Sequence, residues 1–408
     1  MYHKIVKPFE DFFKHEAAGG IVLVFFAAFA LFWVNSSLSS SYAQVFNYHI
    51  TIGYGDFSLS KSLLHWINDG LMAVFFFVVG MEIKRELAAG ELKSVKNALL
   101  PISAALGGMI APAVIYFLFN YNTSNISGWG IPMATDIAFA LGVISLLGKQ
   151  KAPKGLVVFL AALAIVDDLG AILVIALFYT KNIYWPALLV SLIIIMLLVL
   201  SNKLWRKSMF LFIALGLLLW LAILKSGVHA TIAGVILGMV IPLRQKEGDT
   251  DTPMLLRLEH FLQPWTAFFI LPLFALANAG VSIDYSSLKD MAAHPVSFGI
   301  IAGLFFGKQA GIFGMSYISV RLKIARLPRS VNFKQLYGAS LLGGIGFTMS
   351  IFVATLAFQD NHTIAVAKTS IILASLMSAI IGFMVLSRLG EKNTQNAKKK
   401  PVTKCIEG

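Results

Sequence analysis

Apolar runs long enough to cross a bilayer recur along almost the whole chain, separated by short polar segments. A membrane-spanning helix needs about 20 consecutive, mostly apolar residues. By that measure the runs predict twelve transmembrane helices, centred near Phe26, Phe75, Ile110, Ile137, Asp167, Ile194, Leu215, Val235, Leu271, Phe306, Gly346 and Leu376. The pattern therefore indicates an all-α polytopic membrane protein.

The fourth and eleventh predicted helices contain residues that weaken a helix in mid-span. Pro132, followed by Thr135 and Asp136, lies in the fourth. The eleventh carries the glycine-rich run 343–346. Proline removes a backbone hydrogen bond, and glycine is a poor helix former. Two such helices suggest an inverted-repeat transporter with a site at the membrane midplane, although a proline kink and close helix packing are the alternatives.

Two adjacent acids, Asp167 and Asp168, lie near the middle of the fifth helix, in the otherwise uncharged run 155–180. Each carboxylate costs about 2.5 to 3.5 kcal/mol at the centre of a membrane helix unless it is compensated. Adjacent helical residues point about 100° apart, so the two acids face different neighbours. One acid can bind an ion while the other meets a basic residue, which predicts a cation or proton site.

Lys308 is the candidate basic partner, because it lies deep in the otherwise uncharged run 297–320 and cannot easily extend to water. Its helix also carries glycines at every fourth residue, a face that lets a neighbouring backbone approach closely: Gly299, Gly303, Gly307 and Gly311. We predict that Lys308 pairs with one of the two adjacent acids. A purely structural lysine is the alternative.

The oxygen atoms of Asp167, Asp168 and Thr135 suit a hard monovalent cation. Burial and mutual repulsion favour proton binding by the acids, whereas a nearby lysine opposes it. Protons and a cation then compete for the same oxygens, and a site that reorients only when loaded exchanges them. If two protons leave for each cation bound, one net charge crosses per cycle and the membrane potential can drive export.

Charged residues gather at the predicted cytoplasmic ends of two helices. Glu82 and Glu86 close the second helix, and Glu259 and His260 open the ninth. Ordinary charge placement at helix ends explains them. The alternative is a titrating cytoplasmic funnel, because a histidine near carboxylates changes its charge across physiological pH.

One predicted outside loop, at about residues 47–60, has an extended pattern. Tyr48 to Ile52 and Phe57 to Leu59 indicate two short strands around a turn at 53–56. A lone hairpin is marginal in water and gains stability by pairing its edge with a second copy. We predict a homodimer formed through the segment between Ile50 and Leu59. An unchanged dimer after deletion of that segment would remove this hypothesis.

The composition fits a lipid environment, with 58% hydrophobic and 13% charged residues. The net charge of +13 is scattered between apolar runs instead of forming one patch, which argues against a nucleic-acid partner. On the side opposite the amino terminus, the basic residues are limited to Lys61, Lys181, Lys225, Lys289 and Lys368. The positive-inside rule therefore predicts that both termini are cytoplasmic.

Three parts are predicted along the chain. Residues 1–17 form a charged amphipathic segment on the cytoplasmic surface, without a cleavable signal. Residues 18–390 form a single transmembrane domain, whose ion-transport core comes from helices within 97–180 and 296–388. Residues 391–408 form a disordered basic cytoplasmic tail.

Enzymatic chemistry has little support in the sequence. The single cysteine, Cys405, excludes an intramolecular disulfide and a cysteine-based metal site. No zinc-protease, P-loop or serine-nucleophile motif occurs. We therefore expect a protein that is not an enzyme and has no cofactor.

Four segments resemble, in order, the signatures of NhaA-type bacterial sodium/proton antiporters, and the resemblance runs from about residue 15 to residue 388. The segments are 134–140, 164–170, 225–234 and 343–350. The resemblance implies an inner-membrane antiporter that exports Na⁺ or Li⁺ in exchange for protons, by alternating access and with activation at alkaline pH. Its role would be sodium and pH homeostasis.

The same resemblance implies roles for individual residues. The fourth and eleventh helices would cross, with Asp136 balancing positive helix ends and Lys308 balancing negative ones. Asp168 and Asp167 would bind Na⁺ and exchange protons, and Thr135 would lie in the ion site. The resemblance favours Asp167 as the partner of Lys308.

Four residues match family positions implicated in the pH response: Glu82, Glu86, Glu259 and His260. Gln263 stands where a second histidine can occur in that cluster, so the pH set point does not carry over. The predicted hairpin matches the family's dimer contact in place, although its sequence differs.

Two other functions compete with antiport. A sodium-coupled symporter of an organic anion would keep the interrupted helices but need a wide polar substrate cavity. An intramembrane aspartyl protease would use Asp136 and Asp167 from separate helices. Neither acid stands in a Gly-x-Gly-Asp motif, and the adjacent third acid would have no role.

Overall fold

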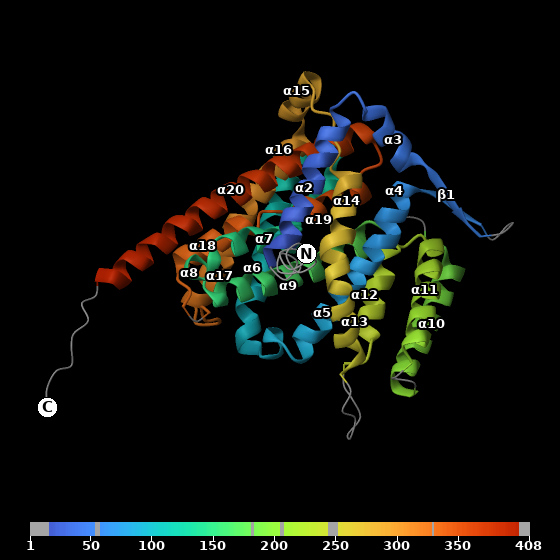
Figure 1. Ribbon diagram of the computed structural model, residues 1–408, viewed down its shortest axis with the longest axis horizontal. Helices are drawn as coiled ribbons and strands as arrows, with labels where there is room; N and C mark the ends of the chain where they lie inside the picture. The colour runs from blue at the N-terminus through green and yellow to red at the C-terminus, as the bar shows by residue number, and fades with distance from the viewer. Residues whose placement is uncertain are drawn as a thin grey trace, which may run out of the picture.

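The chain folds almost entirely into helices, as a computed structural model shows (Figure 1). The structure describes residues 16–53, 58–180, 183–204, 208–243, 252–328 and 330–399. The first helices are α2 (Glu16–Val34), α3 (Ser39–Asn47), α4 (Leu63–His65), η2 (Trp66–Leu71), α5 (Met72–Ala88), η3 (Glu91–Lys93), α6 (Val95–Asn120), η4 (Ile126–Met133), α7 (Ile137–Leu146), α8 (Gly148–Lys151), α9 (Lys154–Phe178) and α10 (Trp185–Leu204).

The remaining helices are α11 (Met209–Ser226), α12 (Thr231–Val240), α13 (Met254–Trp265), η5 (Thr266–Ile270), α14 (Leu271–Asn278), α15 (Tyr285–Ala293), α16 (Pro295–Ile301), η6 (Ala302–Gly307), α17 (Lys308–Arg321), α18 (Phe333–Leu342), α19 (Phe347–Ala357) and α20 (Asn361–Lys399). The segments η3 and η4 are 3₁₀-helices, and η2, η5 and η6 are π-helices.

Many of these helices are long and apolar enough to cross a membrane. Among the described residues there are 9 such helices, or up to 11 if two bent helix pairs each count as one span. Thr231–Val240 is a shorter apolar helix. Every predicted helix centre falls within one of these helices or, for Gly346, at the break between α18 and α19. The chain is thus a multi-pass membrane protein, while the count of twelve stays a prediction.

Both spans predicted to be interrupted do contain breaks. The 3₁₀-helix η4, which includes Pro132, ends at Met133, and the backbone is extended at Ala134 (ψ 147°) and Asp136 (ψ 98°) before α7 begins. The helices α18 and α19 meet at 46° across residues 343–346. Each break leaves backbone groups that other parts of the protein must satisfy.

The glycine face of the tenth predicted span packs against α6. A Cβ atom on Gly311 would lie 2.0 Å from the carbonyl oxygen of Gly107, and one on Gly307 would lie 2.7 Å from the Cα of Pro112. Side chains at these glycines would therefore push the two helices apart. The predicted close approach is confirmed, and it fixes the backbone from which Lys308 extends.

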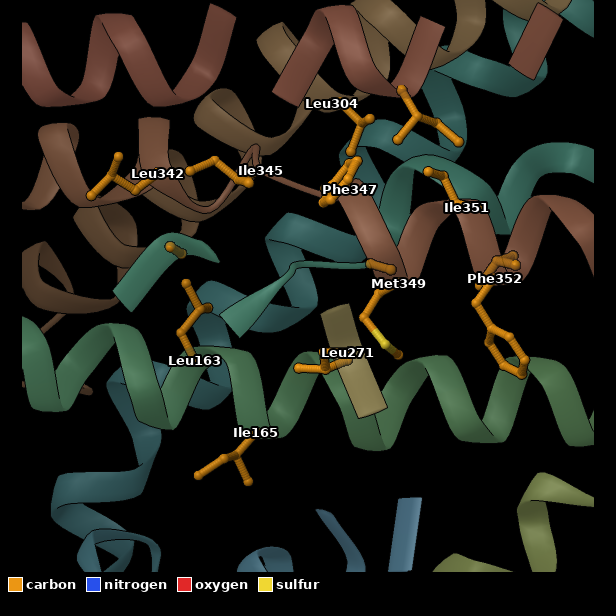
Figure 2. Close-up of a cluster of buried hydrophobic side chains, with 14 of the residues drawn as sticks. Leu163, Ile165, Leu271, Leu304, Leu342, Ile345, Phe347, Met349, Ile351 and Phe352 are labelled. Atoms are coloured by element: carbon orange, nitrogen blue, oxygen red, sulfur yellow. The ribbon is translucent and has the colours of Figure 1, made fainter. Parts of the chain in front are cut away.

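The buried core surrounds the second break. Figure 2 shows Leu304 of η6 beside Phe347 of α19, with Leu163 of α9 and Leu271 of α14 in the same cluster of buried side chains. Each of these side chains is buried. Close packing of this kind holds the ends of the broken span in place.

The predicted hairpin forms, with a correction to its second strand. β1 (His49–Ile52) pairs in antiparallel fashion with β2 (Leu59–Ser62), so the second strand continues three residues past its predicted end at Leu59. Phe57 and most of the predicted turn lie outside the described residues. The Thr51 hydroxyl donates a hydrogen bond to the Ser60 hydroxyl, 2.8 Å away, which favours this cross-strand register. The hairpin projects away from the helices (Figure 1).

The last helix extends into the predicted tail. α20 continues to Lys399, because the polar segment after the membrane span is rich in good helix formers such as Glu, Lys, Gln and Ala. Residues 400–408 lie outside the described residues, as do residues 1–15 of the predicted amino-terminal segment.

Candidate ion-binding site

The two adjacent acids lie on α9, where the apolar sequence forms an uninterrupted helix from Lys154 to Phe178. Asp167 is 1% exposed and Asp168 is 2% exposed. Charged carboxylates at this depth are stable only if protons, cations or basic groups compensate them. Their surroundings therefore decide what they can do.

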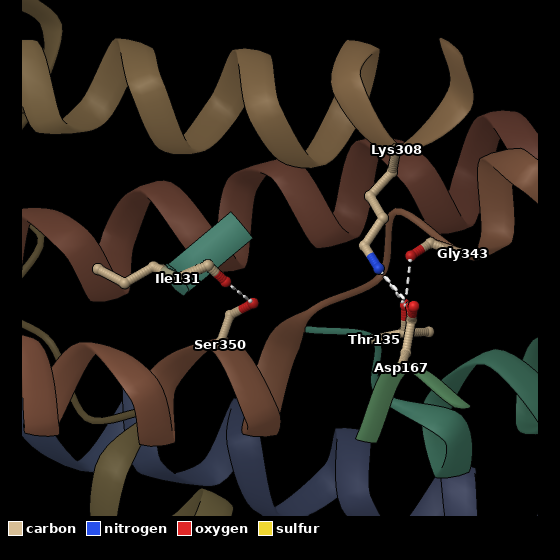
Figure 3. A network of polar contacts seen from close by, with 6 residues as sticks. All are labelled: Ile131, Thr135, Asp167, Lys308, Gly343 and Ser350. Atoms are coloured by element: carbon tan, nitrogen blue, oxygen red, sulfur yellow. Dashed lines mark hydrogen bonds and ion pairs between the residues drawn. The ribbon is translucent and has the colours of Figure 1, made fainter. Parts of the chain in front are cut away.

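One carboxylate oxygen of Asp167, Oδ2, lies within hydrogen-bond distance of both Lys308 and Thr135. The Lys308 ammonium group donates to Asp167 Oδ2 at 2.5 Å and to the Thr135 hydroxyl oxygen at 2.8 Å. Thr135 Oγ1 lies 2.7 Å from Asp167 Oδ2 and 2.9 Å from the Gly343 carbonyl oxygen, and its single proton can serve either acceptor. Figure 3 shows these groups converging from α9, α17 and both breaks.

Asp168 differs from its neighbour because no hydrogen bond to it is found among the described residues. Its Oδ1 atom and that of Asp167 are buried without a partner. The charges of Asp167, Glu82 and Asp136 repel an Asp168 carboxylate, and Lys308 attracts it. Two buried carboxylate oxygens without donors are positions that a cation or a proton can occupy.

Asp136 joins the two breaks. Its Oδ1 atom accepts the backbone N–H of Phe139 at 2.9 Å and so caps α7. Its Oδ2 atom accepts the backbone N–H of Thr348 at 3.0 Å and also the Thr348 hydroxyl. The Asp136 backbone N–H donates to the Ile345 carbonyl at 2.7 Å. One carboxylate thus stabilises the positive ends of two helices.

The start of α19 has a second cap from outside its own span. The backbone N–H groups of Gly346 and Phe347 donate to the Ser375 hydroxyl oxygen at 3.2 and 3.1 Å. The Ser350 hydroxyl donates to the Ile131 carbonyl at 2.8 Å, as Figure 3 shows. These bonds tie the second break to α20 and to η4.

The residues predicted to respond to pH lie on α5 and α13, which contact each other. Arg85 bridges them, because its guanidinium lies 3.2 Å from a Glu259 oxygen and 3.3 Å from a Glu86 oxygen. Glu82 is half-buried and interacts electrostatically with Glu259, Arg85 and Glu86. His260 is exposed and interacts electrostatically with Glu259. The structure therefore brings the four predicted residues into one cluster.

Sequence reasoning missed several groups that shape the site. The Thr348 hydroxyl, the Ser375 hydroxyl and the Arg85 guanidinium were not predicted to have a role. A signal was present for Ser375, because a hydroxyl in an apolar membrane helix commonly bonds to a neighbouring span. The sequence did not indicate which span.

The site is rich in oxygen atoms. It combines the carboxylates of Asp167 and Asp168 with the Thr135 hydroxyl and the Gly343 carbonyl. Such ligands suit hard monovalent cations. Within the part of the chain that the structure describes, no three His, Cys, Asp or Glu side chains are grouped so that they could hold a metal ion.

Fold and site together define the class of protein. A multi-pass helical membrane protein that buries two acids and a lysine beside two broken spans has the organisation of an ion transporter. Residues 10–386 match the family described as Na⁺/H⁺ antiporter 1. The chain belongs to this family, which confirms the resemblance seen in its four motifs.

Individual relatives support the same assignment over nearly their full length. The chain is 58% identical to Na(+)/H(+) antiporter NhaA 1 of Clostridium beijerinckii, over 96% of this chain and 98% of the relative. It is 48% identical to Na(+)/H(+) antiporter NhaA of Haemophilus influenzae, over 95% of this chain and 97% of the relative. It is 47% identical to the NhaA protein of Oleidesulfovibrio alaskensis, over 94% of each chain.

Proposed function

We propose that this protein is a secondary active antiporter that exports Na⁺ in exchange for protons across the bacterial inner membrane. The observation that carries the proposal is the asymmetry of the acid pair. Asp167 is neutralised by Lys308 at 2.5 Å, whereas Asp168 is buried with no described donor. A chain of this family with that arrangement has one compensated acid and one acid ready to take a cation or a proton.

We propose the following exchange at the site. In the arrangement described above, Lys308 and Thr135 occupy one oxygen of Asp167. A Na⁺ or Li⁺ ion would take the free oxygens of Asp168 and Asp167, and its charge would displace protons from Asp168 and from the Asp167–Lys308 pair. Two protons then leave for each cation, so transport is electrogenic, at about 2.3 kcal/mol per charge per 100 mV.

The proposal assigns alternating access to the broken spans, which cross as inverted repeats among twelve transmembrane helices. Asp136 would compensate the positive helix ends and Lys308 the negative ones. Because both breaks share bonds with the site, a change in its loading can move them together. The site would then face one side of the membrane at a time.

We further propose that Glu82, Glu86, Glu259 and His260 set the response to alkaline pH. Two observations support this proposal: the cluster that Arg85 bridges, and the electrostatic interaction between Glu82 and Asp168. A change of charge in the cluster is thereby felt at the ion site. Both termini would be cytoplasmic, and the hairpin would join two copies into a homodimer.

The test is sodium-induced dissipation of an imposed pH gradient in proteoliposomes, from about pH 6 to 9. We expect Na⁺-dependent proton movement in the unmodified protein, abolition in Asp168→Asn, and no change in the matched control Asp360→Asn, an exposed acid outside the site. A voltage clamp by potassium and valinomycin should alter the rate if two protons exchange for one cation. Absence of sodium-dependent proton movement at every pH would favour the symporter instead.

A further inference from the structure

A cavity separate from the ion site opens where two membrane spans begin. It has a volume of about 590 Å³ and lies between the first turns of α6 and α9 and the segment 326–328. The positive-inside rule predicts that this end of both helices is cytoplasmic. A cavity of this size is within the range that holds small ligands.

The rim of the cavity is cationic. Lys96, Lys154 and Arg326 line it, and all three side chains are exposed. Its lining residues include no carboxylate. Within the described ranges, these three side chains have no ion pair or hydrogen bond with another residue. Three basic groups kept close together without a counter-charge indicate a site for an anion.

The two helix starts strengthen the positive potential. α6 begins at Val95 and α9 begins at Lys154, and each helix has more than 20 residues. The amino-terminal end of a helix carries a partial positive charge. The potential at the rim therefore comes from the backbone as well as from the side chains.

The inner wall of the cavity is apolar. Leu100 and Phe159 are buried in it, and Val158 is 44% exposed. A small soluble anion needs the cationic rim but gains nothing from this wall. A phospholipid uses both, because its phosphate binds the rim while an acyl chain follows the wall.

We propose that this cavity binds the head group of an anionic phospholipid, with its phosphate held by Lys96, Lys154 and Arg326. The bound lipid would contact α9, which carries the acid pair, and the segment that leads into α18, which ends at the second break. It would also contact α6, against which the Lys308 helix packs. The site therefore links the composition of the cytoplasmic leaflet to the helices around the ion site.

The experiment measures lipid binding to the full chain by native mass spectrometry, in titrations with phosphatidylglycerol and with phosphatidylcholine. The test variant is Lys96→Gln/Lys154→Gln/Arg326→Gln. The matched control removes three exposed basic residues that do not line the cavity, Lys93→Gln/Lys334→Gln/Arg388→Gln. Each basic residue near an anionic lipid is worth about fivefold in binding, so we expect the test variant to bind phosphatidylglycerol at least about tenfold more weakly than the control.

A second variant and a competitor separate a lipid from a soluble anion. Val158→Trp narrows the apolar wall without changing charge, and it should weaken phosphatidylglycerol binding even if the triple variant does not fold. Inorganic phosphate at millimolar concentration should not displace the lipid. Equal lipid binding by the test and control triple variants would contradict the proposal that this cavity binds a phospholipid. Full displacement by phosphate, with no effect of Val158→Trp, would assign the cavity to a soluble anion and overturn the lipid proposal.

Discussion

The two broken spans start their second helices in different ways. α7 begins after Asp136, whose own carboxylate accepts the N–H of Phe139. α19 begins after Gly346, which has no side chain to cap the helix, so its first N–H groups donate to Ser375 of α20 and to Asp136. The first break carries its own cap, whereas the second takes its caps from two other spans.

Because of this difference, the two breaks depend on different side chains to cap their second helices. A change at Asp136 removes acceptors from both breaks, while a change at Ser375 removes an acceptor from the second break only. Buried amide groups without acceptors are costly in a membrane. The effects of substitutions should therefore fall in the order of how many caps they remove.

Asp136→Ala should have the largest effect. It leaves the Phe139 N–H, the Thr348 N–H and the Thr348 hydroxyl without their acceptor, at about 1–3 kcal/mol for each unsatisfied group. We expect a stability loss of about 3 kcal/mol or more and loss of transport, measured by denaturation in detergent and by proteoliposome assay. Asp136→Asn, which keeps an acceptor oxygen, should lose less stability. An unchanged unfolding midpoint in Asp136→Ala would contradict the shared cap.

Ser375→Ala should affect the second break alone. Two backbone N–H groups lose one shared acceptor, which predicts a stability loss of about 1–2 kcal/mol and a raised KM for sodium. Ser375→Thr should restore both values because it keeps the hydroxyl. The control is Ser370→Ala on the same helix, whose hydroxyl contacts Ser297 instead of a break. If that control raises the KM equally, the effect belongs to α20 as a whole.

Thr348→Val should have a smaller effect, because it removes the hydroxyl bond to Asp136 and leaves the backbone bond in place. A single net hydrogen bond predicts a loss of about 1 kcal/mol. Thr348→Ser keeps the hydroxyl and serves as the control. Combining Thr348→Val with Asp136→Ala should add little to Asp136→Ala alone, and full additivity would show that the two groups act independently.

The smallest effect on stability is expected at Asp360, a helix cap that is exposed to water. Asp360 is fully exposed, and its carboxylate accepts the N–H and the hydroxyl of Thr363 at 2.9 and 2.8 Å, which lowers the pKa of Asp360. Because its pKa is lower in the folded state, this stabilisation is present above the unfolded-state pKa and is lost as the pH falls through the folded-state value. Asp360→Ala should be slightly less stable near pH 7, and the difference from the unmodified protein should vanish in acid. A difference that persists in acid would rule out this origin.

Much of the fold could be predicted from local sequence patterns. The apolar runs predicted where helices lie, and Pro132 and the glycines at 343–346 predicted where two spans break. The four-residue glycine spacing predicted a close helix contact, and the structure confirms one with α6. These features follow from backbone propensity and burial, which depend on residues near one another along the chain.

The arrangement of the candidate site could be predicted only in part from local sequence patterns. The cost of burying charge predicted that Lys308 needs an acid from the pair 167–168, but helix geometry left open which one. Packing decided that Asp167 receives the lysine, across 141 positions of sequence, and leaves Asp168 without it. The sequence also suggested that the second strand ends at Leu59, whereas pairing with β1 extends it to Ser62.

The sequence by itself determined the membrane environment, the helical spans, the positions of the breaks and the presence of charges that require partners. Only the tertiary structure decided how those charges and broken ends are satisfied, as with Thr348, which bonds to Asp136 212 positions earlier. The physical reason is the distance along the chain over which each interaction acts. Hydrophobic spacing and helix propensity act over a few residues, whereas a buried donor finds its acceptor only after distant spans have packed together.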